Sequence, residues 1–352
     1  MPKTAPMPTH VRAAVALLGA VVSAVALPTA ADAPAAYLAG SRAFVANNAA
    51  ALGYSPNDLA ALMADARYQQ GIIDAMNRPY EAKPWRDYRR LFLTEERIAG
   101  GVSFLNDHAD LLKKAEAAYG VPPEIITAII GIETNYGGNL GQHRVLDALS
   151  TLGFAFPRRA EFFSKELGEF LRLVREEQID PRTALGSYAG AVGLPQFIPS
   201  SYRAYAVDFD GDNRRDLWGS KADVVGSVGN YLALHGWHRG APVAARVSLG
   251  TGRPAGIPVA EKRPARPETT LSRLAAAGVE PVPGALAEPL PADTLAALLE
   301  LDGEDTEHWL GFNNFYAITR YNHSNLYAMA VYQLSREIAA RAGAEGGDDA
   351  PG

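Results

Sequence analysis

One glutamate lies on the apolar face of a helical segment and is the first candidate for chemistry in this sequence. Ile125, Ile129 and Glu133 are spaced four residues apart, so their side chains share one face of a helix. A carboxylate on such a face is costly unless it is paired or protonated, and desolvation raises the pKa of a glutamate. Glu133 is therefore a candidate general acid at neutral pH. The alternative is a glutamate that has reached the helix end and turned to solvent.

The residues on either side of Glu133 indicate the element that must hold it. Prolines at 122–123 suit the first turn of a helix, and Glu124 complements the positive end of the helix dipole. Asn135 and the glycines within 137–141 break the helix directly after Glu133. The carboxyl group is therefore predicted at the end of an element, where a cleft can open.

A glycine-rich run over residues 186–201 supplies groups that suit a sugar. Three glycines within eight residues let the backbone approach a ligand closely. Ser187 and Gln196 offer hydroxyl and amide groups, and Phe197 offers a flat apolar face. By itself, such a run is more often an ordinary loop.

A second candidate site is an acidic loop with the spacing of an EF-hand. Carboxylates stand at positions 1, 3, 5 and 9 of this loop: Asp208, Asp210, Asp212 and Asp216. Asn213 replaces the usual glycine at position six, and Gly219 stands where a glutamate is expected. The alternative is an Asp/Asn/Gly turn that binds no metal.

Composition narrows the functional classes. The chain has 352 residues, and 33 Lys and Arg against 39 Asp and Glu give a formal net charge of −6, which argues against a nucleic-acid partner. The absence of cysteine excludes a disulfide framework, a thiolate metal site and a cysteine nucleophile. Hydrophobic residues make up 48% and charged residues 20%, as in globular chains, and the length allows two or three packed units.

Residues 1–33 are predicted to be a cleavable signal peptide. A weakly basic start precedes an apolar run over residues 13–27, which is shorter than the roughly 20 residues that a membrane-spanning helix needs. Small residues follow this run and suit a signal peptidase, and no cysteine is present to carry a lipid anchor. We therefore expect an exported protein that is not a lipoprotein; the alternative is an uncleaved membrane anchor.

The hydrophobic pattern divides the rest of the chain into five regions. Apolar residues at helical spacing predict an N-terminal helical region over 35–115. Residues 116–240 carry the motifs above and form the predicted core. Prolines restrict residues 241–312 to short strands and turns. A C-terminal helix within 313–342 completes the core, and residues 343–352 are predicted to be a disordered tail.

Taken together, these segments resemble the B-type lytic murein transglycosylases, periplasmic enzymes that cleave peptidoglycan and have a lysozyme-like core. The resemblance runs in order from about residue 37 to 340, interrupted mainly by the proline-rich insert. The matching segments are Trp85 with 88–90, the Glu133 segment, 156–159, 186–201, 230–231, 235–237, 318–324 and 327–331.

The resemblance implies a fold that is mainly α (α+β), with a lysozyme-like core, an N-terminal helical domain and a small strand-containing insert. It implies a monomeric periplasmic enzyme that acts on peptidoglycan glycan strands, with cell-wall synthesis or division proteins as further partners. No cofactor is expected for catalysis.

The resemblance also implies the site residues. The catalytic glutamate of the family falls on Glu133. The residues that contact saccharide fall on Tyr88, Arg158, Arg159, Ser187, Gln196, Phe197, Tyr231, Tyr321, Asn322 and Tyr327. One departure is Val192, which replaces a common methionine and is expected to make one wall of the sugar cleft less deep.

Two groups among these residues have alternatives. Arg158 and Arg159 either form a solvated pair, or one of them anchors a carboxylate of the substrate or holds Glu133 in place. Tyr321 and Tyr327 either contact the sugar or pack the last helix as core aromatics. The sequence does not separate these roles.

The implied mechanism needs one carboxylate, whereas most glycoside hydrolases use two. Asp147 and Glu161 are near Glu133 in sequence but lie in segments without a matching motif. In the family mechanism, Glu133 protonates the oxygen between N-acetylmuramic acid and N-acetylglucosamine, then acts as base on the C6 hydroxyl to give a 1,6-anhydro product. The alternatives are a hydrolytic muramidase and a non-catalytic peptidoglycan-binding protein.

The family also has a lengthened acidic loop, which implies a structural Ca²⁺ site. Its ligands fall on the side chains of Asp208, Asp210, Asp212 and Asp223 and on the carbonyl of Arg214. The ion is expected to be structural, because the chemistry needs a proton donor.

Overall fold

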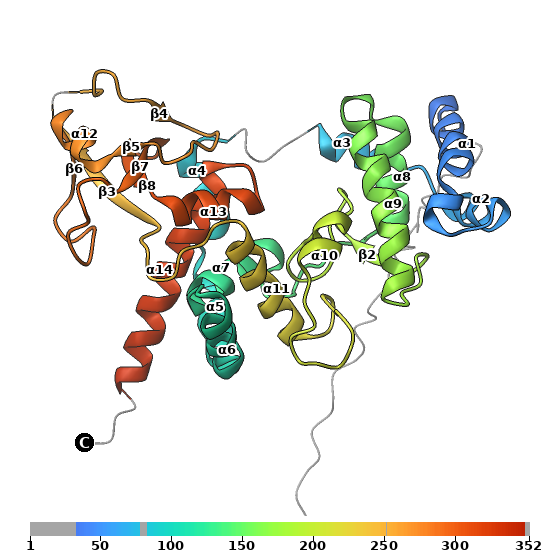
Figure 1. Cartoon of the computed structure of the whole chain (residues 1–352), viewed down its shortest axis with the longest axis horizontal. Coiled ribbons are helices and arrows are strands. Elements are labelled where there is room, and N and C mark those ends of the chain that lie inside the picture. The colour runs from blue at the N-terminus through green and yellow to red at the C-terminus, as the bar shows by residue number, and fades with distance from the viewer. Residues whose placement is uncertain (1–32, 78–82, 251, 349–352) are drawn as a thin grey trace, which may run out of the picture.

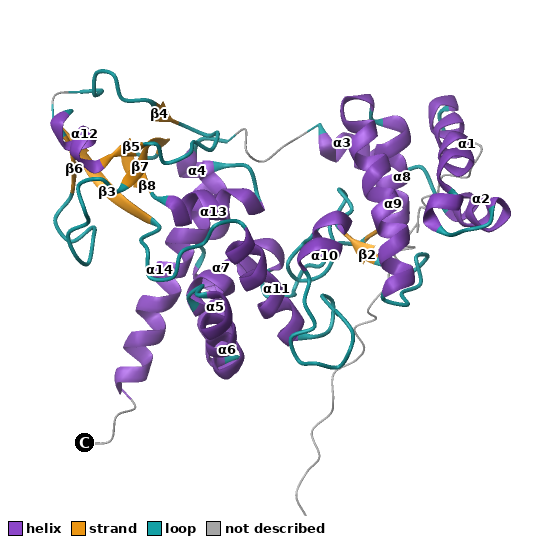
Figure 2. Ribbon diagram, in the orientation of Figure 1, coloured by secondary structure: helices purple, strands orange, loops and turns teal. Residues whose placement is uncertain are grey.

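The structure, a computed structural model, describes residues 33–77, 83–250 and 252–348. Residues 1–32 of the predicted signal peptide and the last four residues of the predicted tail lie outside these ranges. Helices make up most of the described chain, and the strands gather mainly in one part of it (Figure 2). The expected fold class, mainly α with a small strand-containing insert, is confirmed.

A first group of helices packs around α8 (Figure 1). Its members are α1 (Ala35–Asn48), the 3₁₀ turn η2 (Ala50–Leu52), α2 (Pro56–Asp65), α3 (Gln70–Met76), α8 (Val145–Ala155), the 3₁₀ turn η4 (Pro157–Arg159) and α9 (Ala160–Glu176). The Tyr37 hydroxyl lies 3.3 Å from the Ser150 hydroxyl and joins α1 to α8. Ser55 begins α2 by accepting the N–H of Asp58 at 3.1 Å.

A second group packs around α7 and α14. Its members are α4 (Trp85–Phe92), α5 (Glu95–Asp107), α6 (Ala109–Tyr119), α7 (Pro123–Thr134), α11 (Lys221–Leu234), α13 (Asn313–Tyr321) and α14 (Asn325–Asp348). Its core includes the isoleucines of α7, from Ile125 to Ile132. Together these helices surround the segment that carries Glu133.

The predicted N-terminal helical region is divided between these two groups. Helices α1 and α3 pack on α8, whereas α4 and α5 pack on α14 and α6 packs on α11. The periodicity of an amphipathic helix shows that one face is covered but not which element covers it. The region over 35–115 therefore contributes to both sides of the molecule.

Short elements connect the two groups. They are the paired strands β1 (His143–Arg144) and β2 (Leu185–Gly186), together with α10 (Pro199–Tyr205), which packs on α9. The glycine-rich run lies between β2 and α10, and the acidic loop lies between α10 and α11. The acidic loop is therefore held by a helix at each end, and the glycine-rich run by a strand at one end and a helix at the other.

Residues 244–311 form a small sheet with its own apolar cluster. Its elements are β3 (Ala244–Leu249), β4 (Val259–Ala260), β5 (Thr269–Thr270), α12 (Leu271–Ala276), β6 (Val279–Pro281), β7 (Leu295–Asp302) and β8 (Thr306–Gly311). The strand order is β4-β7-β8-β3-β6, with β5 also paired to β7. Neighbours are antiparallel except β4 and β7, and Leu298 lies opposite Leu310 in the β7–β8 hairpin. This is the strand-containing insert expected over 241–312.

The last helix is longer than expected. Helix α14 continues to Asp348, although a disordered tail was predicted from residue 343. Alanine and glutamate within 342–345 favour helix and offset the cost of Gly343. The helix therefore extends into the segment for which disorder was predicted.

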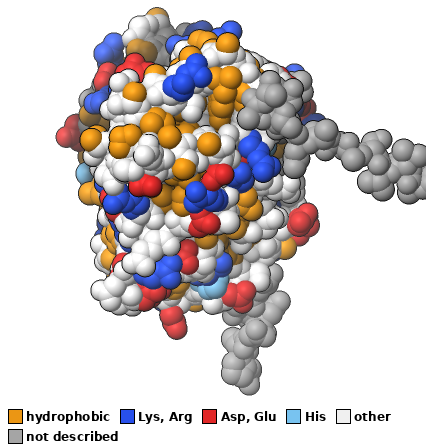
Figure 3. Space-filling model, turned by 90° about the vertical axis from the view of Figure 1, so that its right-hand side faces the viewer, with side chains coloured by type: hydrophobic (Ala, Val, Ile, Leu, Met, Phe, Trp, Pro, Cys, Tyr) orange, Lys and Arg blue, Asp and Glu red, His pale blue; other side chains and the backbone are white. Residues whose placement is uncertain are grey.

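Two surface properties bear on partners. Figure 3 looks onto the side of the molecule that carries α1 and α2, and positive and negative side chains are interspersed there. Within the ranges that the structure describes, no helix combines the length and apolar character needed to span a bilayer.

Candidate active site

Helix α7 places Glu133 in its last turn. The helix begins with Pro123 at its first position and ends after Thr134, where Asn135 takes a left-handed conformation with φ of 50°. The residues from Ile125 to Ile132 are buried, whereas Glu133 keeps partial exposure. The predicted helix end directly after Glu133 is confirmed.

The Glu133 carboxyl group contacts one polar side chain that comes from far along the chain. The Tyr327 hydroxyl, at the start of α14, donates a hydrogen bond to Glu133 Oε1 at 2.6 Å. Burial raises the pKa of Glu133 to about 7, and the hydrogen bond from Tyr327 opposes this shift. At neutral pH a large fraction of Glu133 therefore carries a proton.

Aromatic side chains from three elements gather beside this pair. The Tyr321 ring lies 6.3 Å from the Tyr327 ring at an interplanar angle of 11°, 4.8 Å from Tyr231 and 5.7 Å from Phe197. The Tyr321 hydroxyl donates to the carbonyl of Pro195 at 2.6 Å. The structure thus brings together with Glu133 four of the residues predicted to contact saccharide.

These aromatic rings differ in exposure. Phe197, Tyr231 and Tyr327 are buried, whereas Tyr321 is partly exposed. Burial raises the pKa of Tyr321 well above its usual value, and the Glu133 carboxylate adds to this effect. Tyr321 therefore lies near Glu133 and packs against the three buried rings.

Tyr88 lies on α4, a helix that packs against the α14 helix of Tyr327. It is buried on α4, 6.4 Å from the Trp85 ring, and its charge is among the causes that raise the pKa of Tyr327, of which burial is the largest. Tyr88 is therefore a buried aromatic residue of α4 near Tyr327 and not an exposed sugar contact.

The glycine-rich run is bound to the end of α7. The Thr134 hydroxyl donates to the carbonyl of Leu194 at 3.0 Å, which ties the run to the residue after Glu133. The N–H of Val192 donates to Phe197 at 2.8 Å, and the N–H of Phe197 donates back at 3.1 Å. Val192 is fully buried beneath this run, and the shallower wall of the sugar cleft stays a prediction.

The polar side chains of this run contact its own backbone. Ser187 Oγ accepts the N–H of Ala191 at 3.0 Å. Gln196, at φ of 50°, donates from Nε2 to Gly193 at 2.9 Å and to Leu140 at 3.3 Å. These bonds fix the shape of the run, and both side chains keep partial exposure.

The remaining predicted contacts do not reach Glu133. Arg158 and Arg159 are exposed on η4, and the Arg159 guanidinium lies over the Phe162 ring at 4.3 Å. Neither arginine is among the causes that shift the pKa of Glu133, so the structure does not support holding of Glu133 by this pair. Asn322 is partly buried at the turn between α13 and α14, where its carbonyl accepts the N–H of Ser324 at 2.7 Å.

Two acids that lie near Glu133 in sequence, Asp147 and Glu161, have other partners. Asp147 accepts the N–H of Arg67 at 2.9 Å, and Glu161 is exposed and paired with Lys165 at 2.8 Å. Among the described residues, no other carboxylate contributes to the pKa of Glu133. Glu133 is therefore the acid that the structure places beside the aromatic rings.

The acidic loop is folded around Asp208. This side chain accepts the N–H groups of Gly211 and Asn213, each at 2.7 Å. Asn213 takes φ of 69°, the left-handed conformation that the glycine of an EF-hand supplies and that asparagine tolerates. Ligand oxygens of Asp208, Asp210 and Asp212 lie within 4.8 Å of one another.

The two other predicted ligands have different places. Asp223 is buried, and its two oxygens accept the N–H groups of Phe209 at 2.8 Å and Asp216 at 2.7 Å. It is therefore joined to both ends of the loop but lies outside the cluster of three carboxylates. The N–H of Arg214 donates to Asp212 Oδ1 at 2.8 Å, which holds the Arg214 backbone beside that cluster.

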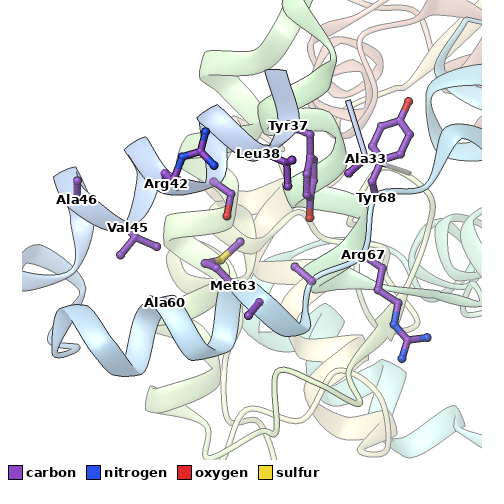
Figure 4. Close-up of a pocket in the computed structure, with 13 residues that line it drawn as sticks. Ala33, Tyr37, Leu38, Arg42, Val45, Ala46, Ala60, Met63, Arg67 and Tyr68 are labelled. Atoms are coloured by element: carbon purple, nitrogen blue, oxygen red, sulfur yellow. The ribbon is translucent and has the colours of Figure 1, made fainter. Parts of the chain in front are cut away.

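A separate cavity of about 740 Å³ lies between α1 and α2 (Figure 4). Its lining is mainly apolar and includes Tyr37, Leu38, Val45 and Met63. None of the predicted site residues lines it.

A mainly helical core, in which one acid at a helix end meets a set of aromatic rings, defines the lysozyme-like class of glycan-cleaving enzymes. The family model described as a transglycosylase SLT domain matches residues 39–336. The chain is 43% identical over 298 residues to membrane-bound lytic murein transglycosylase B of Escherichia coli, covering 82% of this chain and 79% of that protein. The chain belongs to this family of lytic murein transglycosylases and is an enzyme, as the sequence motifs predicted.

Solved structures agree with this assignment. The soluble lytic transglycosylase SltB1 from Pseudomonas aeruginosa is 46% identical, with a TM-score of 0.79 over 86% of this chain and 99% of that chain. The lytic transglycosylase Slt35 of Escherichia coli, solved in complex with calcium, is 42% identical, with a TM-score of 0.76 over 86% of this chain and 93% of that chain.

Two contacts of the site were not predicted from the sequence. They are the hydrogen bond from Thr134 to Leu194 and the contacts of Tyr136 with the preceding helices. Both residues directly follow Glu133, and that position was the only available signal.

Proposed function

We propose that this enzyme cleaves the β-1,4 bond between N-acetylmuramic acid and N-acetylglucosamine of peptidoglycan and leaves 1,6-anhydromuramic ends. The observation that carries the proposal is the single Glu133 carboxyl group, with a pKa raised to about 7 and the Tyr327 hydroxyl 2.6 Å away. A protonated carboxylic acid can donate to a glycosidic oxygen at neutral pH.

The reaction has two proton transfers at the same group. Glu133 first gives its proton to the glycosidic oxygen, which leaves as the 4-hydroxyl of N-acetylglucosamine while positive charge develops at C1 of the muramic sugar. The Glu133 carboxylate then takes the proton of the C6 hydroxyl as that oxygen bonds to C1. The ring closes, and Glu133 is protonated again.

The attacking hydroxyl belongs to the substrate, so a second carboxylate is not required. A well-aligned intramolecular group acts at an effective concentration of about 10⁵ M or more. The substrate N-acetyl group can stabilise the charge at C1, as in substrate-assisted glycosidases. The described residues around Glu133, which supply one acid and no carboxylate partner to its pKa, suit this route.

Saccharide binding is assigned to the residues around this acid. Tyr321 would present an aromatic face, and the partly exposed Ser187, Gln196 and Asn322 would supply hydrogen bonds. Phe197, Tyr231, Tyr88 and Tyr327 would hold the floor of the site. Arg158 and Arg159, being exposed, would meet carboxylates of the peptide or lactyl group.

A hydrolytic muramidase on the same fold is the second candidate. An inverting hydrolase needs a base carboxylate about 6.5–9.5 Å from the acid, and a retaining one needs a nucleophile about 5–5.5 Å away. Digestion of purified sacculi followed by mass analysis of the soluble products separates these reactions, because only the transglycosylase leaves anhydro ends. Sacculi that stay intact would indicate a binding protein that performs neither reaction.

Replacing Tyr327 with phenylalanine should raise the pKa of Glu133, because the lost hydrogen bond favours the charged form. The high-pH limb of kcat/KM should move to higher pH by about one unit or less. Tyr332→Phe is a matched control: it removes a hydroxyl from the same helix, at a ring that packs against Trp309 at 6.3 Å. A limb that moves to lower pH would contradict the assigned hydrogen bond.

We also propose that the acidic loop binds one structural Ca²⁺. The cluster of Asp208, Asp210 and Asp212 offers the hard oxygen donors that calcium prefers, and the carbonyl of Arg214 lies in the same loop. Asp223 would support the loop from below through its two backbone hydrogen bonds. The ion would neutralise clustered negative charge and would hold the segment between α10 and α11.

Calcium is then expected to raise the melting temperature of the enzyme. At a concentration about 100 times the Kd, binding to the folded state alone adds about 2.7 kcal/mol, or several degrees. Asp210→Asn should weaken this response, whereas the exposed Asp180→Asn outside the loop should keep it. Identical melting in chelator and in millimolar calcium would contradict the site.

The cellular setting is proposed on the sequence. Residues 1–33 would direct export and be removed, which would leave a monomeric periplasmic enzyme that is not a lipoprotein, in contact with cell-wall synthesis or division proteins. The related protein of Escherichia coli is named as membrane-bound. Mass measurement of the protein recovered from the periplasm would show whether the leader is cleaved.

A further inference from the structure

The end of the helix that carries Glu133 is tied to α5 by an arginine. Arg97, near the start of α5, donates from Nε to the carbonyl of Gly131 at 3.0 Å and from Nη1 to the carbonyl of Leu91 at 2.6 Å. Gly131 lies two residues before Glu133, and its carbonyl also accepts the N–H of Asn135 at 3.0 Å. Arg97 thus adds a second hydrogen bond to a carbonyl in the C-terminal turn of α7.

A tyrosine completes this set of contacts from the other side of Glu133. The Tyr136 hydroxyl donates to the carbonyl of Arg97 at 2.8 Å. Its backbone is in the left-handed region, with φ of 59°, directly after Asn135 at 50°. The chain therefore reverses direction directly after α7, and the Tyr136 ring packs on α5. The Arg97 side chain links α5 to α7.

Glycines make room for this ring. A Cβ atom would lie 3.0 Å from the Tyr136 ring at Gly100, 2.6 Å from its hydroxyl at Gly101 and 2.5 Å from its hydroxyl at Gly131. The Phe104 ring, 5.7 Å away, covers the ring further along α5. At Gly101 and Gly131 an added Cβ would overlap the tyrosine hydroxyl unless the ring shifted, whereas at Gly100 it would make a tight contact.

We propose that Arg97 and Tyr136 are positioning residues that fix the last turn of α7 and thereby aim the Glu133 carboxyl group. The proposal rests on the assignment of Glu133 as the acid and base of the proposed function. Neither residue touches the carboxyl group: its hydrogen bond comes from Tyr327, and Tyr321 faces it from α13. Arg97 and Tyr136 act on the backbone on both sides of Glu133.

The two proton transfers explain why the orientation of the last turn of α7 matters. Glu133 must reach the glycosidic oxygen and then the C6 hydroxyl, so small rotations of the last turn displace it from both. A misplacement of about 1 Å can lower a rate by about a hundredfold. The partial exposure of Glu133 also depends on this turn, since unwinding would admit water to the carboxyl group and return its pKa toward 4.5.

The test uses three variants. Two replace a glycine within a helix by alanine, and the third deletes a hydroxyl group. Gly131→Ala places a Cβ against the Tyr136 hydroxyl, whereas Gly168→Ala on α9 places one at 3.8 Å from its closest neighbour, an ordinary contact. Both changes improve helix propensity. Tyr136→Phe keeps the ring and removes only its hydrogen bond to Arg97.

Cleavage of soluble, uncrosslinked peptidoglycan strands should fall in Gly131→Ala and Tyr136→Phe. We expect kcat to drop between about tenfold and about a hundredfold, with KM within about twofold of the parent enzyme. The high-pH limb of kcat/KM should move to lower pH in both variants. Gly168→Ala should match the parent enzyme in kcat, in KM and in the position of this limb. Melting temperatures identify variants that are unfolded at the assay temperature.

Two outcomes overturn different statements. If Glu133→Gln is inactive while Tyr136→Phe keeps the parental kcat and pH limb, the positioning role is wrong and the proposed function stands. If Glu133→Gln is fully active, the proposed function itself fails. If Gly131→Ala does not fold, Tyr136→Phe alone tests the positioning role, because it adds no atom to the packed region around the Tyr136 ring.

Discussion

Replacing Glu133 with glutamine should lower the cleavage rate by at least about 10²–10⁴-fold. Glutamine keeps the size of the side chain and can still accept the hydrogen bond from Tyr327, but it has no proton to give and no basic oxygen to receive one. Because one group performs both proton transfers, neither the departure of N-acetylglucosamine nor the attack of the C6 hydroxyl is assisted in the variant. The rate on purified sacculi measures the effect.

The same variant should remain folded and should gain stability at high pH. Folding raises the pKa of Glu133 from 4.5 to about 7, so the folded state holds its proton more tightly, and stability falls as pH rises between these values. Glutamine removes this penalty, which amounts to at most about 3 kcal/mol above pH 7. Retained glycan binding with lost cleavage supports the assignment; full residual activity would refute it.

The second large effect is the dependence of activity on pH. The acid must be protonated in the free enzyme, and its pKa is about 7, so kcat/KM should fall about tenfold for each pH unit above that value. Because half of Glu133 is already ionised at pH 7, raising the pH from 7 to 9 should lower kcat/KM by about fiftyfold. A pH series with soluble glycan strands measures this limb.

Stability must be followed across the same series. If the melting temperature stays well above the assay temperature up to pH 9, a loss of rate reports ionisation and not unfolding. A rate that is flat between pH 7 and 9 would mean that no group with the raised pKa of Glu133 acts as the acid.

The position of the acid could be predicted because its signals are local. The spacing of Ile125, Ile129 and Glu133 and the break at Asn135 lie within one short segment, and the structure places the helix end where this pattern put it. The acidic loop is similarly local, and three of its carboxylates do cluster. Such features depend on spacing along the chain alone.

The surroundings of the acid could not be derived in this way. Tyr327 meets Glu133 across 194 residues, and only resemblance to a family placed it at the site. No local pattern predicts that the Arg97 side chain reaches Gly131 or that three glycines lie beside the Tyr136 ring. The partners of α1–α3 were missed for the same reason, because helical periodicity does not identify what covers an apolar face.

The most direct test of the central claim is digestion of purified sacculi in water enriched in oxygen-18, followed by mass analysis of the muramic ends. Attack by the C6 hydroxyl predicts ends that carry no label and are lighter than a reducing end by the mass of one water. Reducing ends that carry oxygen-18 would show that water, and not the substrate hydroxyl, attacks C1, and would contradict the account.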